Sequence, residues 1–189
     1  PRSTLFPYTT LFRSVEDDAE LNRQVCNYLR LNGYETTGCL SANDAFNAMY
    51  GSMFDMIISD IMMPGMDGFE FAKTVRDLNR EIPILFMTAR EDFESKRRGF
   101  ELGIDDYMVK PIDLEELLLH VGALLRRAGI ATERKLELGS LVLDADERSA
   151  VLKGEEIPLT VREFNLLYKL LSYPKKAFTR SQLMDEFWD

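Results

Sequence analysis

Four segments of the chain place acidic, hydroxyl or ammonium side chains at the end of an apolar, strand-like run. Asp60, for example, ends the run 56–59 and is followed at once by turn residues. When parallel strands end in this way, their polar residues gather at one edge of the sheet, where open α/β sheets bind ligands. Two acidic centres, one hydroxyl and one ammonium suit metal-assisted phosphoryl transfer to an aspartate. The side chains of this set are Glu16, Asp17, Asp60, Thr88 and Lys110.

A cation is needed to hold the acidic groups together. The carboxylates of Asp17 and Asp60 repel each other unless a positive charge lies between them. Mg²⁺ takes oxygen ligands, keeps several waters and commonly relies on one or two carboxylates plus a phosphate. We therefore expect Asp17 and Asp60 to bind Mg²⁺ directly and Glu16 to bind it through water. The backbone carbonyl of Met62 would supply a further ligand from the turn.

Asp60 is the predicted phosphoacceptor. With the charge of an incoming phosphoryl group neutralised, its carboxylate is free to attack phosphorus in line. Lys110 would pair with one phosphoryl oxygen and Thr88 would donate a hydrogen bond to another. The added charge and acceptor oxygens would pull donors inward and repack the neighbouring surface. We expect a switch, not a turnover enzyme.

Composition limits the class of protein. With 189 residues and 46% apolar content, the chain has room for one ordinary domain and part of another. Two cysteines without metal-ligand spacing indicate a reduced, cytoplasmic protein, and no apolar run is long enough to span a bilayer. A single histidine excludes a histidine-based metal cluster. The net charge of −9 comes mainly from residues 15–127, and no basic concentration typical of a duplex DNA binder is visible.

The first 14 residues resemble the in-frame translation of a sequencing adapter, and we exclude them from the fold prediction. A signal peptide is the alternative, but Pro7 interrupts the short apolar stretch. The segment would replace most of the first strand, so Arg13 and Ser14 would fall in a strand normally buried on both faces. Burial of an unpaired arginine is unfavourable, which predicts a loss of stability.

Apolar runs alternate with helical patterns from residue 15 to residue 127, which predicts a doubly wound α/β domain with a parallel sheet. After a short small-residue linker, residues 128–134, the pattern changes to short antiparallel strands and two helices. The strands expected in the first domain are 11–15, 34–39, 55–59, 82–88 and 106–109, and its helices are 18–31, 42–50, 68–79, 91–102 and 113–127.

The polar segments resemble the motifs of bacterial two-component response regulators. In order, the acid pair, the phosphoacceptor loop, the switch threonine and the aromatic-plus-lysine motif are 15–18, 60–68, 87–90 and 105–111. The resemblance implies a flavodoxin-like receiver with five parallel strands. It also implies that the ring of Tyr107 turns inward with Thr88, and that the bond between Lys110 and Pro111 is cis.

Residues 135–189 resemble the first part of the winged-helix effector domain of the OmpR/PhoB-type subfamily, mainly through segment 157–167. The recognition helix and the wing of that family would follow Asp189, so we do not expect this chain alone to bind promoter DNA. The resemblance implies a transcription regulator that receives a phosphoryl group from a sensor histidine kinase. Phosphorylation would switch dimerisation and DNA binding of the full-length protein.

The resemblance further implies a homodimer, formed on phosphorylation through the fourth helix, the fifth strand and the fifth helix of the receiver. His120 stands where the family usually has arginine, so we expect a weaker contact there. With Leu119, it falls off the apolar stripe of its helix and should face outward. The positions expected at this interface are Lys96, Asp105, Asp106, Glu116, His120 and Arg127.

Two other functions remain open. One is a phosphohydrolase of the haloacid-dehalogenase type, which also forms an aspartyl phosphate with Mg²⁺. Such enzymes carry a second aspartate two residues after the nucleophile, where this chain has Met62, which argues for a long-lived phosphoryl group. The other is a stand-alone receiver that acts through protein contacts.

Overall fold

The computed structural model describes residues 11–49, 54–89, 93–130, 135–174 and 176–188. The chain divides into two compact units, of which one comprises Thr10–Ala128 and the other contains Gly129–Asp189. Most of the adapter-like segment and residues 131–134 of the expected linker lie outside the described residues. We describe each unit by itself.

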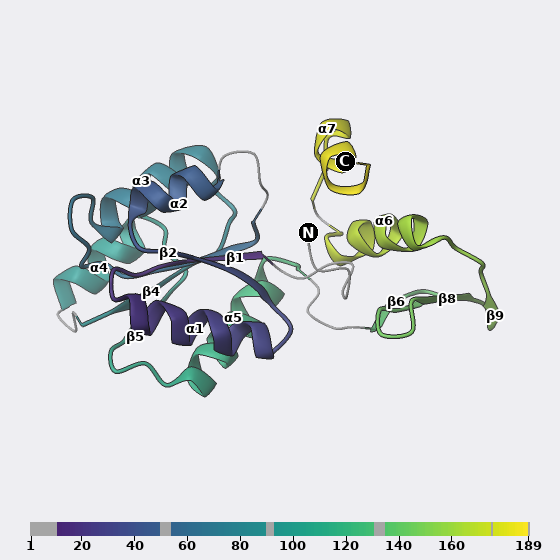
Figure 1. Cartoon of the computed structure of the whole chain (residues 1–189), viewed down its shortest axis with the longest axis horizontal. Helices are drawn as coiled ribbons and strands as arrows, with labels where there is room; N and C mark the ends of the chain where they lie inside the picture. The colour runs from purple at the N-terminus through teal and green to yellow at the C-terminus, as the bar shows by residue number, and fades with distance from the viewer. Residues whose placement is uncertain (1–10, 50–53, 90–92, 131–134, 175, 189) are drawn as a thin grey trace. The chain divides into compact units, whose positions relative to one another are not determined.

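The first unit is a five-stranded parallel sheet with helices on both faces (Figure 1). The strand order is β2-β1-β3-β4-β5, as predicted for the flavodoxin-like fold. Helices α1 and α5 cover one face of the sheet, and α2, α3 and α4 cover the other. In chain order the elements are β1 (Leu11–Val15), α1 (Ala19–Leu31), β2 (Glu35–Cys39), α2 (Ala42–Met49), β3 (Met56–Ser59), α3 (Gly68–Leu78), β4 (Ile84–Thr88), α4 (Phe93–Glu101), β5 (Asp106–Val109) and α5 (Leu114–Arg127).

The central strands are buried because both of their faces lie under helices. Every residue of β3 and β4 is buried, which explains why both read as continuous apolar runs. Aspartates fix where three helices begin, since each accepts hydrogen bonds from backbone N–H groups of the first turn. These N-caps are Asp18 for α1, Asp67 for α3 and Asp113 for α5.

Strand β1 buries Arg13 and Ser14, as the sequence predicts. The expectation of an unpaired arginine is wrong, however. The Arg13 guanidinium donates to Thr37 Oγ1 and to the Ala48 carbonyl, both at 2.9 Å, and lies over the ring of Phe54. Burial nevertheless lowers the pKa of Arg13, because the charged form is disfavoured away from water.

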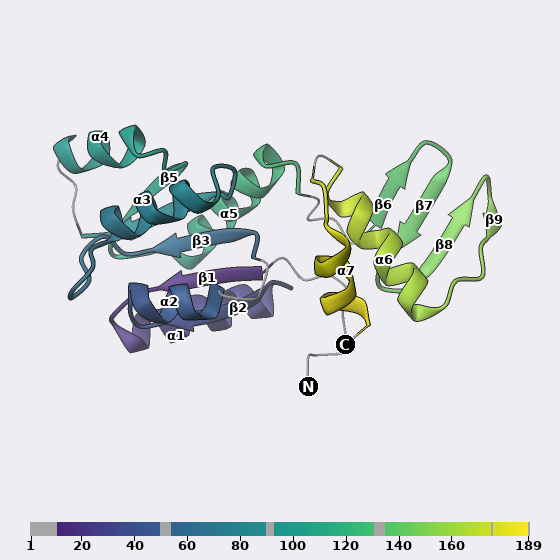
Figure 2. The ribbon, with the colours of Figure 1, turned by 90° about the horizontal axis from the view of Figure 1, so that it is seen from above.

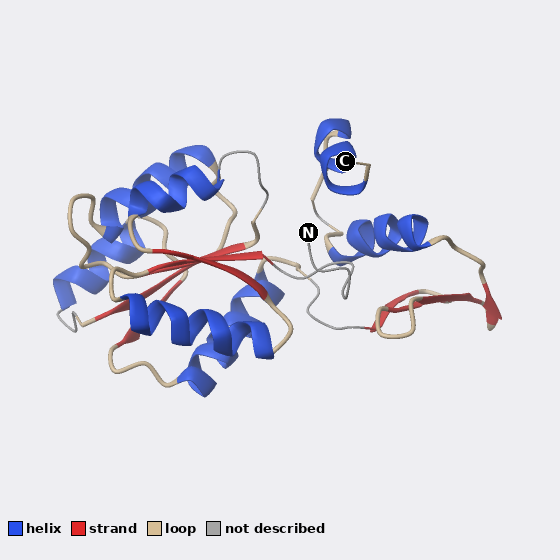
Figure 3. Ribbon diagram, viewed as in Figure 1, coloured by secondary structure: helices blue, strands red, loops and turns tan. Residues whose placement is uncertain are grey.

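The second unit has a four-stranded antiparallel sheet followed by two helices (Figure 3). Figure 2 shows the strands side by side in the order β6-β7-β8-β9. A small core around Leu143, Phe164 and Tyr168 joins the sheet to the first helix. The elements are β6 (Lys135–Leu138), β7 (Leu141–Asp144), β8 (Ser149–Leu152), β9 (Glu155–Glu156), α6 (Val161–Ser172) and α7 (Arg180–Phe187).

Both helices of this unit begin with a capping box, in which side chain and backbone exchange hydrogen bonds. Thr160 and Glu163 form the first, and Thr179 and Gln182 form the second. Lys169 of α6 is buried against Glu186 of α7, with 3.0 Å between Nζ and Oε1. In the described parts of both units, no helix combines the length and the apolar character that a membrane crossing requires.

Candidate functional site

The candidate site lies at the carboxyl edge of the parallel sheet, where β1 and β3 are neighbours and the strand order reverses. Glu16 is the first residue after β1, and Asp60 is the first after β3. Backbone hydrogen bonds hold both: the Glu16 N–H donates to the Cys39 carbonyl, and the Asp60 N–H donates to the Val15 carbonyl. The ends of adjacent strands therefore bring these two carboxylates together.

Three carboxylates form one cluster at this edge. The nearest oxygens of Glu16, Asp17 and Asp60 all lie within 4.8 Å of one another. The side chains of Glu16 and Asp60 are 1% and 5% exposed, whereas Asp17 is exposed. Two buried carboxylates at this distance need compensating positive charge.

Lys110 supplies part of that charge. Its Nζ lies 2.7 Å from Asp60 Oδ2 and 2.9 Å from Glu16 Oε1. Burial alone lowers the pKa of the Lys110 ammonium, but the hydrogen bonds to Asp60 and Glu16 outweigh burial and raise this pKa above its usual value. The peptide bond between Lys110 and Pro111 is cis, as expected.

Glu16 carries a raised pKa. Burial is the largest cause, since it disfavours the carboxylate, and the neighbouring charge of Asp60 adds to it. The hydrogen bond from Lys110 opposes this shift without cancelling it. The ionised form of Glu16 is therefore held in an unfavourable environment.

The donor set fits a hard divalent cation. All three side chains offer oxygen, which Mg²⁺ prefers. Glu16 Oε2 is buried and lies 2.8 Å from Nζ of Lys110, yet it accepts no hydrogen bond from the described part of the chain. An oxygen in this position can serve a metal ion or its water.

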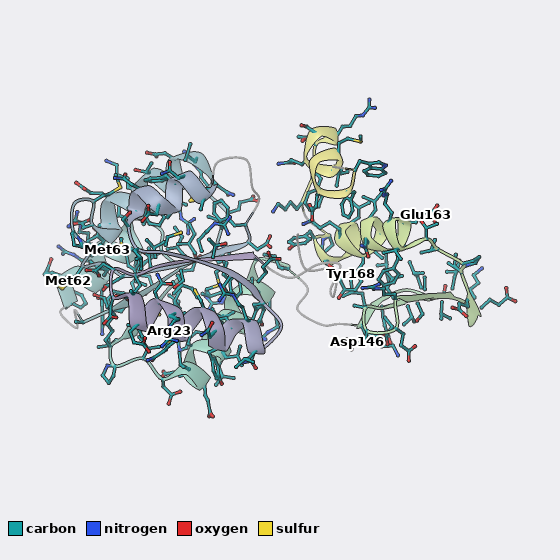
Figure 4. The ribbon with its side chains drawn as sticks, viewed as in Figure 1. Arg23, Met62, Met63, Asp146, Glu163 and Tyr168 are labelled. Atoms are coloured by element: carbon teal, nitrogen blue, oxygen red, sulfur yellow. The ribbon has the colours of Figure 1, made fainter. Side chains whose placement is uncertain are left out.

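The β3–α3 loop also contacts the phosphoacceptor. The Met62 N–H donates to Asp60 Oδ1 at 3.0 Å, which orients the carboxylate. The Met62 side chain is 52% exposed, while Met63 is buried, and Figure 4 shows Met62 at the margin of the unit. The carbonyl of Met62 stays a predicted ligand.

Thr88 lies on β4, which neighbours β3, and Tyr107 lies on β5, the next strand of the sheet. Thr88 ends β4 and is fully buried, and its carbonyl accepts the Lys110 N–H at 2.9 Å. The ring of Tyr107 on β5 packs edge-on against Phe86, with 6.5 Å between ring centroids. Their switch roles stay predictions, and Arg90 of the same motif lies outside the described residues.

Several residues expected at a dimer interface have partners within the chain. Asp105 accepts from Arg76 and from the Ile84 N–H, both at 2.8 Å. Asp106 Oδ2 lies 2.6 Å from His120 Nδ1, so His120 is half-buried and does not simply face outward. The remaining positions are Lys96, whose ammonium lies over the Tyr107 ring, Glu116, which is 3.6 Å from His120, and Arg127 at the end of α5. The interface itself stays a prediction.

Asn22 of α1 is a polar residue beside the site that the sequence patterns did not indicate. Asn22 is buried together with Val25, Cys26 and Leu29 on the inner face of this helix. Gly38, inside strand β2, was the available signal, because glycine in a strand interior often marks a close approach.

Comparison with known proteins identifies the family. Residues 13–122 match the model of the response regulator receiver domain, and residues 154–189 match that of the C-terminal domain of transcriptional regulatory proteins. The chain belongs to the response regulator family. The expected family and the fold of the receiver are thereby confirmed, together with an OmpR-type DNA-binding domain.

Similar response regulators cover most of the chain. The heme response regulator HssR of Staphylococcus epidermidis is 36% identical over 174 residues, which are 92% of this chain and 77% of that protein. The transcriptional regulatory protein ResD of Bacillus subtilis is 34% identical over 182 residues, 92% of this chain and 75% of that protein.

Solved structures agree with the sequence relatives. The response regulator DrrB of Thermotoga maritima, an OmpR/PhoB homologue, has a TM-score of 0.60 and 29% identity, covering 96% of this chain and 81% of that chain. The chemotaxis protein CheY4 of Vibrio cholerae has a TM-score of 0.61 and 32% identity, covering 62% of this chain and all of that chain. The second match covers a receiver alone.

Proposed function

We propose that this response regulator is cytoplasmic and that its Asp60 accepts a phosphoryl group from a phosphohistidine of a sensor histidine kinase, with Mg²⁺ as the cofactor. The observation that carries the proposal is the meeting of Glu16, Asp17 and Asp60 at the sheet edge, where the Lys110 ammonium pairs with Glu16 and Asp60. Paired carboxylates with a lysine suit an acceptor whose product must be held and neutralised. Few other chemistries require both paired carboxylates and a lysine ammonium at one site.

In the transfer, a carboxylate oxygen of Asp60 forms a bond to phosphorus while the bond from phosphorus to the kinase imidazole nitrogen breaks. The electron pair of the broken bond stays on that nitrogen, so an acyl phosphate and a histidine result. The Met62 N–H orients the Asp60 carboxylate through Oδ1. Lys110 already contacts Oδ2 and would pair with a phosphoryl oxygen, and Thr88 would donate to another.

Glu16, Asp17, Asp60 and the Met62 carbonyl would hold the cation. When bound, Mg²⁺ supplies positive charge that stabilises the phosphoryl oxygens as charge develops on them. The proposed ligands are all hard oxygen donors, and two of the three side chains are buried. The buried Oε2 of Glu16, which lies 2.8 Å from Lys110 Nζ but accepts no hydrogen bond from the described residues, supports this set.

The proposed output is a change in association. Phosphorylation would draw Thr88 and Tyr107 inward and favour a homodimer through α4, β5 and α5. Lys96, Asp105, Asp106, Glu116, His120 and Arg127 would form its polar contacts. In the full-length protein, dimerisation would in turn control binding to promoter DNA.

The test is chemical labelling with acetyl phosphate, a small acyl phosphate donor. The parent chain should take up one phosphoryl group when Mg²⁺ is present and almost none with a chelator. Asp60→Ala should abolish the uptake, because the acceptor oxygen is gone. Labelling is followed by the mass of the intact protein.

Asp77→Asn is the matched control, since Asp77 is an exposed carboxylate on α3. This variant should be labelled like the parent. Unchanged labelling of Asp60→Ala would refute Asp60 as the acceptor, and labelling that ignores Mg²⁺ would refute the metal site.

A further inference from the structure

Asn22 is a buried amide at the junction of three elements. It lies in the first half of α1, and only 3% of its surface is exposed. Its Nδ2 donates to the backbone carbonyls of Cys39, Glu16 and Ser14, at 2.7, 3.1 and 3.2 Å. An amide group has two hydrogens, so at least one of them is shared between carbonyls.

These carbonyls belong to the carboxyl end of β1, which leads into the acidic cluster, and to that of its neighbour β2. Val15 and Cys39 are the last paired residues of β1 and β2. The Glu16 carbonyl lies one residue beyond that ladder, where a buried carbonyl needs another donor. The Glu16 N–H donates to the Cys39 carbonyl, which is also the closest acceptor of Asn22. Asn22 therefore contacts the Glu16 backbone in two ways. It donates to the Glu16 carbonyl, and it shares the Cys39 carbonyl with the Glu16 N–H.

The surroundings of Asn22 are fitted to this amide. Its Oδ1 lies 3.3 Å from the Cys26 thiol, which donates to it. A Cβ atom on Gly38 of β2 would stand 2.5 Å from the same Oδ1, a distance that no side chain tolerates without a shift. Glycine at position 38 therefore leaves the space that the amide fills.

We propose that Asn22 is a positioning residue for the proposed cation site. By fixing the backbone at Glu16, it sets the direction in which the buried carboxylate of Glu16 leaves the chain, toward Asp60 and Lys110. Asn22 itself touches neither the cation nor the phosphoryl group. The inference rests on the proposed function, because it assigns Asn22 a part in the same site.

Metal affinity separates this role from a purely structural one. Any loss of three buried hydrogen bonds lowers stability, so a lower melting temperature decides nothing. The dissociation constant for Mg²⁺, measured by calorimetry on folded protein at 25 °C, responds only if the ligands move. Residues that orient metal ligands typically change metal affinity by about 10- to 100-fold when they are removed.

Asn22→Ala should therefore weaken Mg²⁺ binding about 10-fold or more. Asn27→Ala is the matched control, because Asn27 is an exposed asparagine on the same helix, and its affinity should equal that of the parent. If Asn22→Ala does not fold, Asn22→Ser retains one donor and should show a smaller loss in the same direction.

Gly38→Ala supplies an independent test that leaves Asn22 in the chain. The added methyl group should displace the amide and weaken Mg²⁺ binding. In the Asn22→Ala background, the same change should cause little further loss, because the Oδ1 that it meets is gone. Non-additive effects of this kind identify one shared cause.

Parent-like Mg²⁺ affinity in folded Asn22→Ala, or in folded Asn22→Ser and Gly38→Ala, would overturn the inference. So would fully additive losses in the double variant. If the parent itself bound no Mg²⁺ and took no label from acetyl phosphate, the proposed function would fail, which is a distinguishable result.

Discussion

Two buried carboxylates share one ammonium at the centre of this site. Lys110 compensates one unit of negative charge, while Glu16 and Asp60 carry two. Burial first, and then the neighbouring charge of Asp60, raises the pKa of Glu16. The site therefore has more negative than positive charge, and a divalent cation would supply the missing positive charge.

Glu16→Gln should stabilise the protein at pH 7 when a chelator removes divalent cations. Because its pKa is raised, folded Glu16 binds its proton more tightly than the unfolded chain does. The stability linked to that proton is fully present below the unfolded pKa of roughly 4.3 and is lost as the pH rises through the folded pKa. The melting advantage of the variant should therefore shrink as the pH falls toward this range.

Mg²⁺ should reverse the order of the two proteins. At 100 times its dissociation constant, a ligand of the folded state adds about 2.7 kcal/mol to the stability of the parent, and Glu16→Gln should gain much less. Glu81→Gln is the control, since Glu81 is exposed. The assigned role of Glu16 would be contradicted if Glu16→Gln melted below the parent with chelator at pH 7 and yet kept the full gain in stability from Mg²⁺.

At the level of single residues, the sequence predicted those whose position at the end of a strand is informative. Asp60 and Lys110 follow apolar strands directly, and the spacing of the four polar segments distinguished them from an ordinary turn former and a surface lysine. Asn22 gave no such signal, because an asparagine within a helical pattern more often faces solvent than a core. Its role depends on carbonyls of two strands, whose meeting only the tertiary structure reveals.

Among the elements, strand β1 is buried and yet carries an arginine, a residue type that is poorly suited to burial. Arg13 is 4% exposed in a strand that lies between β2 and the apolar strand β3. Its hydrogen bonds to Thr37 and Ala48 reduce the penalty of burial, and its lowered pKa shows that a penalty remains.

Arg13→Val should raise the free energy of unfolding by about 1 kcal/mol, because replacing a buried charge with an apolar side chain is often stabilising. Chemical denaturation of both proteins measures this change. Arg23→Val, at an exposed position on α1, should change stability by less than about 0.5 kcal/mol. An unchanged or lower stability of Arg13→Val would show that its hydrogen bonds fully offset burial.

Helix α5 belongs to the proposed dimer interface, and its residue His120 can be tested there. His120 lies against Asp106 of its own chain, so neither group is fully available to a second copy. After phosphorylation, the His120→Arg variant should dimerise roughly threefold more tightly than the parent, which is the effect expected of one exposed ion pair. The reason is that arginine is permanently charged and its side chain is longer than that of histidine. Analytical ultracentrifugation measures the affinity.

Gln24→Arg adds the same charge at an exposed position on α1 and should leave dimerisation unchanged. Equal dimer affinity of His120→Arg and the parent would reject the idea. The helical period predicted that His120 faces outward, but its ring is half-buried against Asp106 of β5, a contact that the period could not foresee.

For the whole molecule, alternating apolar runs and helical patterns predicted a parallel sheet with helices on both faces, because strands buried on both faces need such layers. The flavodoxin-like strand order was implied by the family resemblance and not by the pattern. Strand ends shifted by one or two residues, for example in β2 and β4, since a strand ends where its ladder ends and not where the apolar run does. The antiparallel second unit was predicted from its short strands and turns.

The first unit, Thr10–Ala128, contains every proposed ligand and the acceptor. Expressed alone, this segment should show the same Mg²⁺-dependent rise in melting temperature as the full chain, and it should be labelled by acetyl phosphate to the same extent. A segment that folds but takes up no label, while the full chain does, would show that the second unit contributes to the site.

The most direct test of the site is to locate the phosphoryl group within the chain. After incubation with acetyl phosphate, borohydride reduces an aspartyl phosphate to homoserine, which peptide mass spectrometry can place in the sequence. We expect homoserine at position 60, and only when Mg²⁺ is present. Homoserine at another aspartate, or at position 60 regardless of Mg²⁺, would contradict the proposed site.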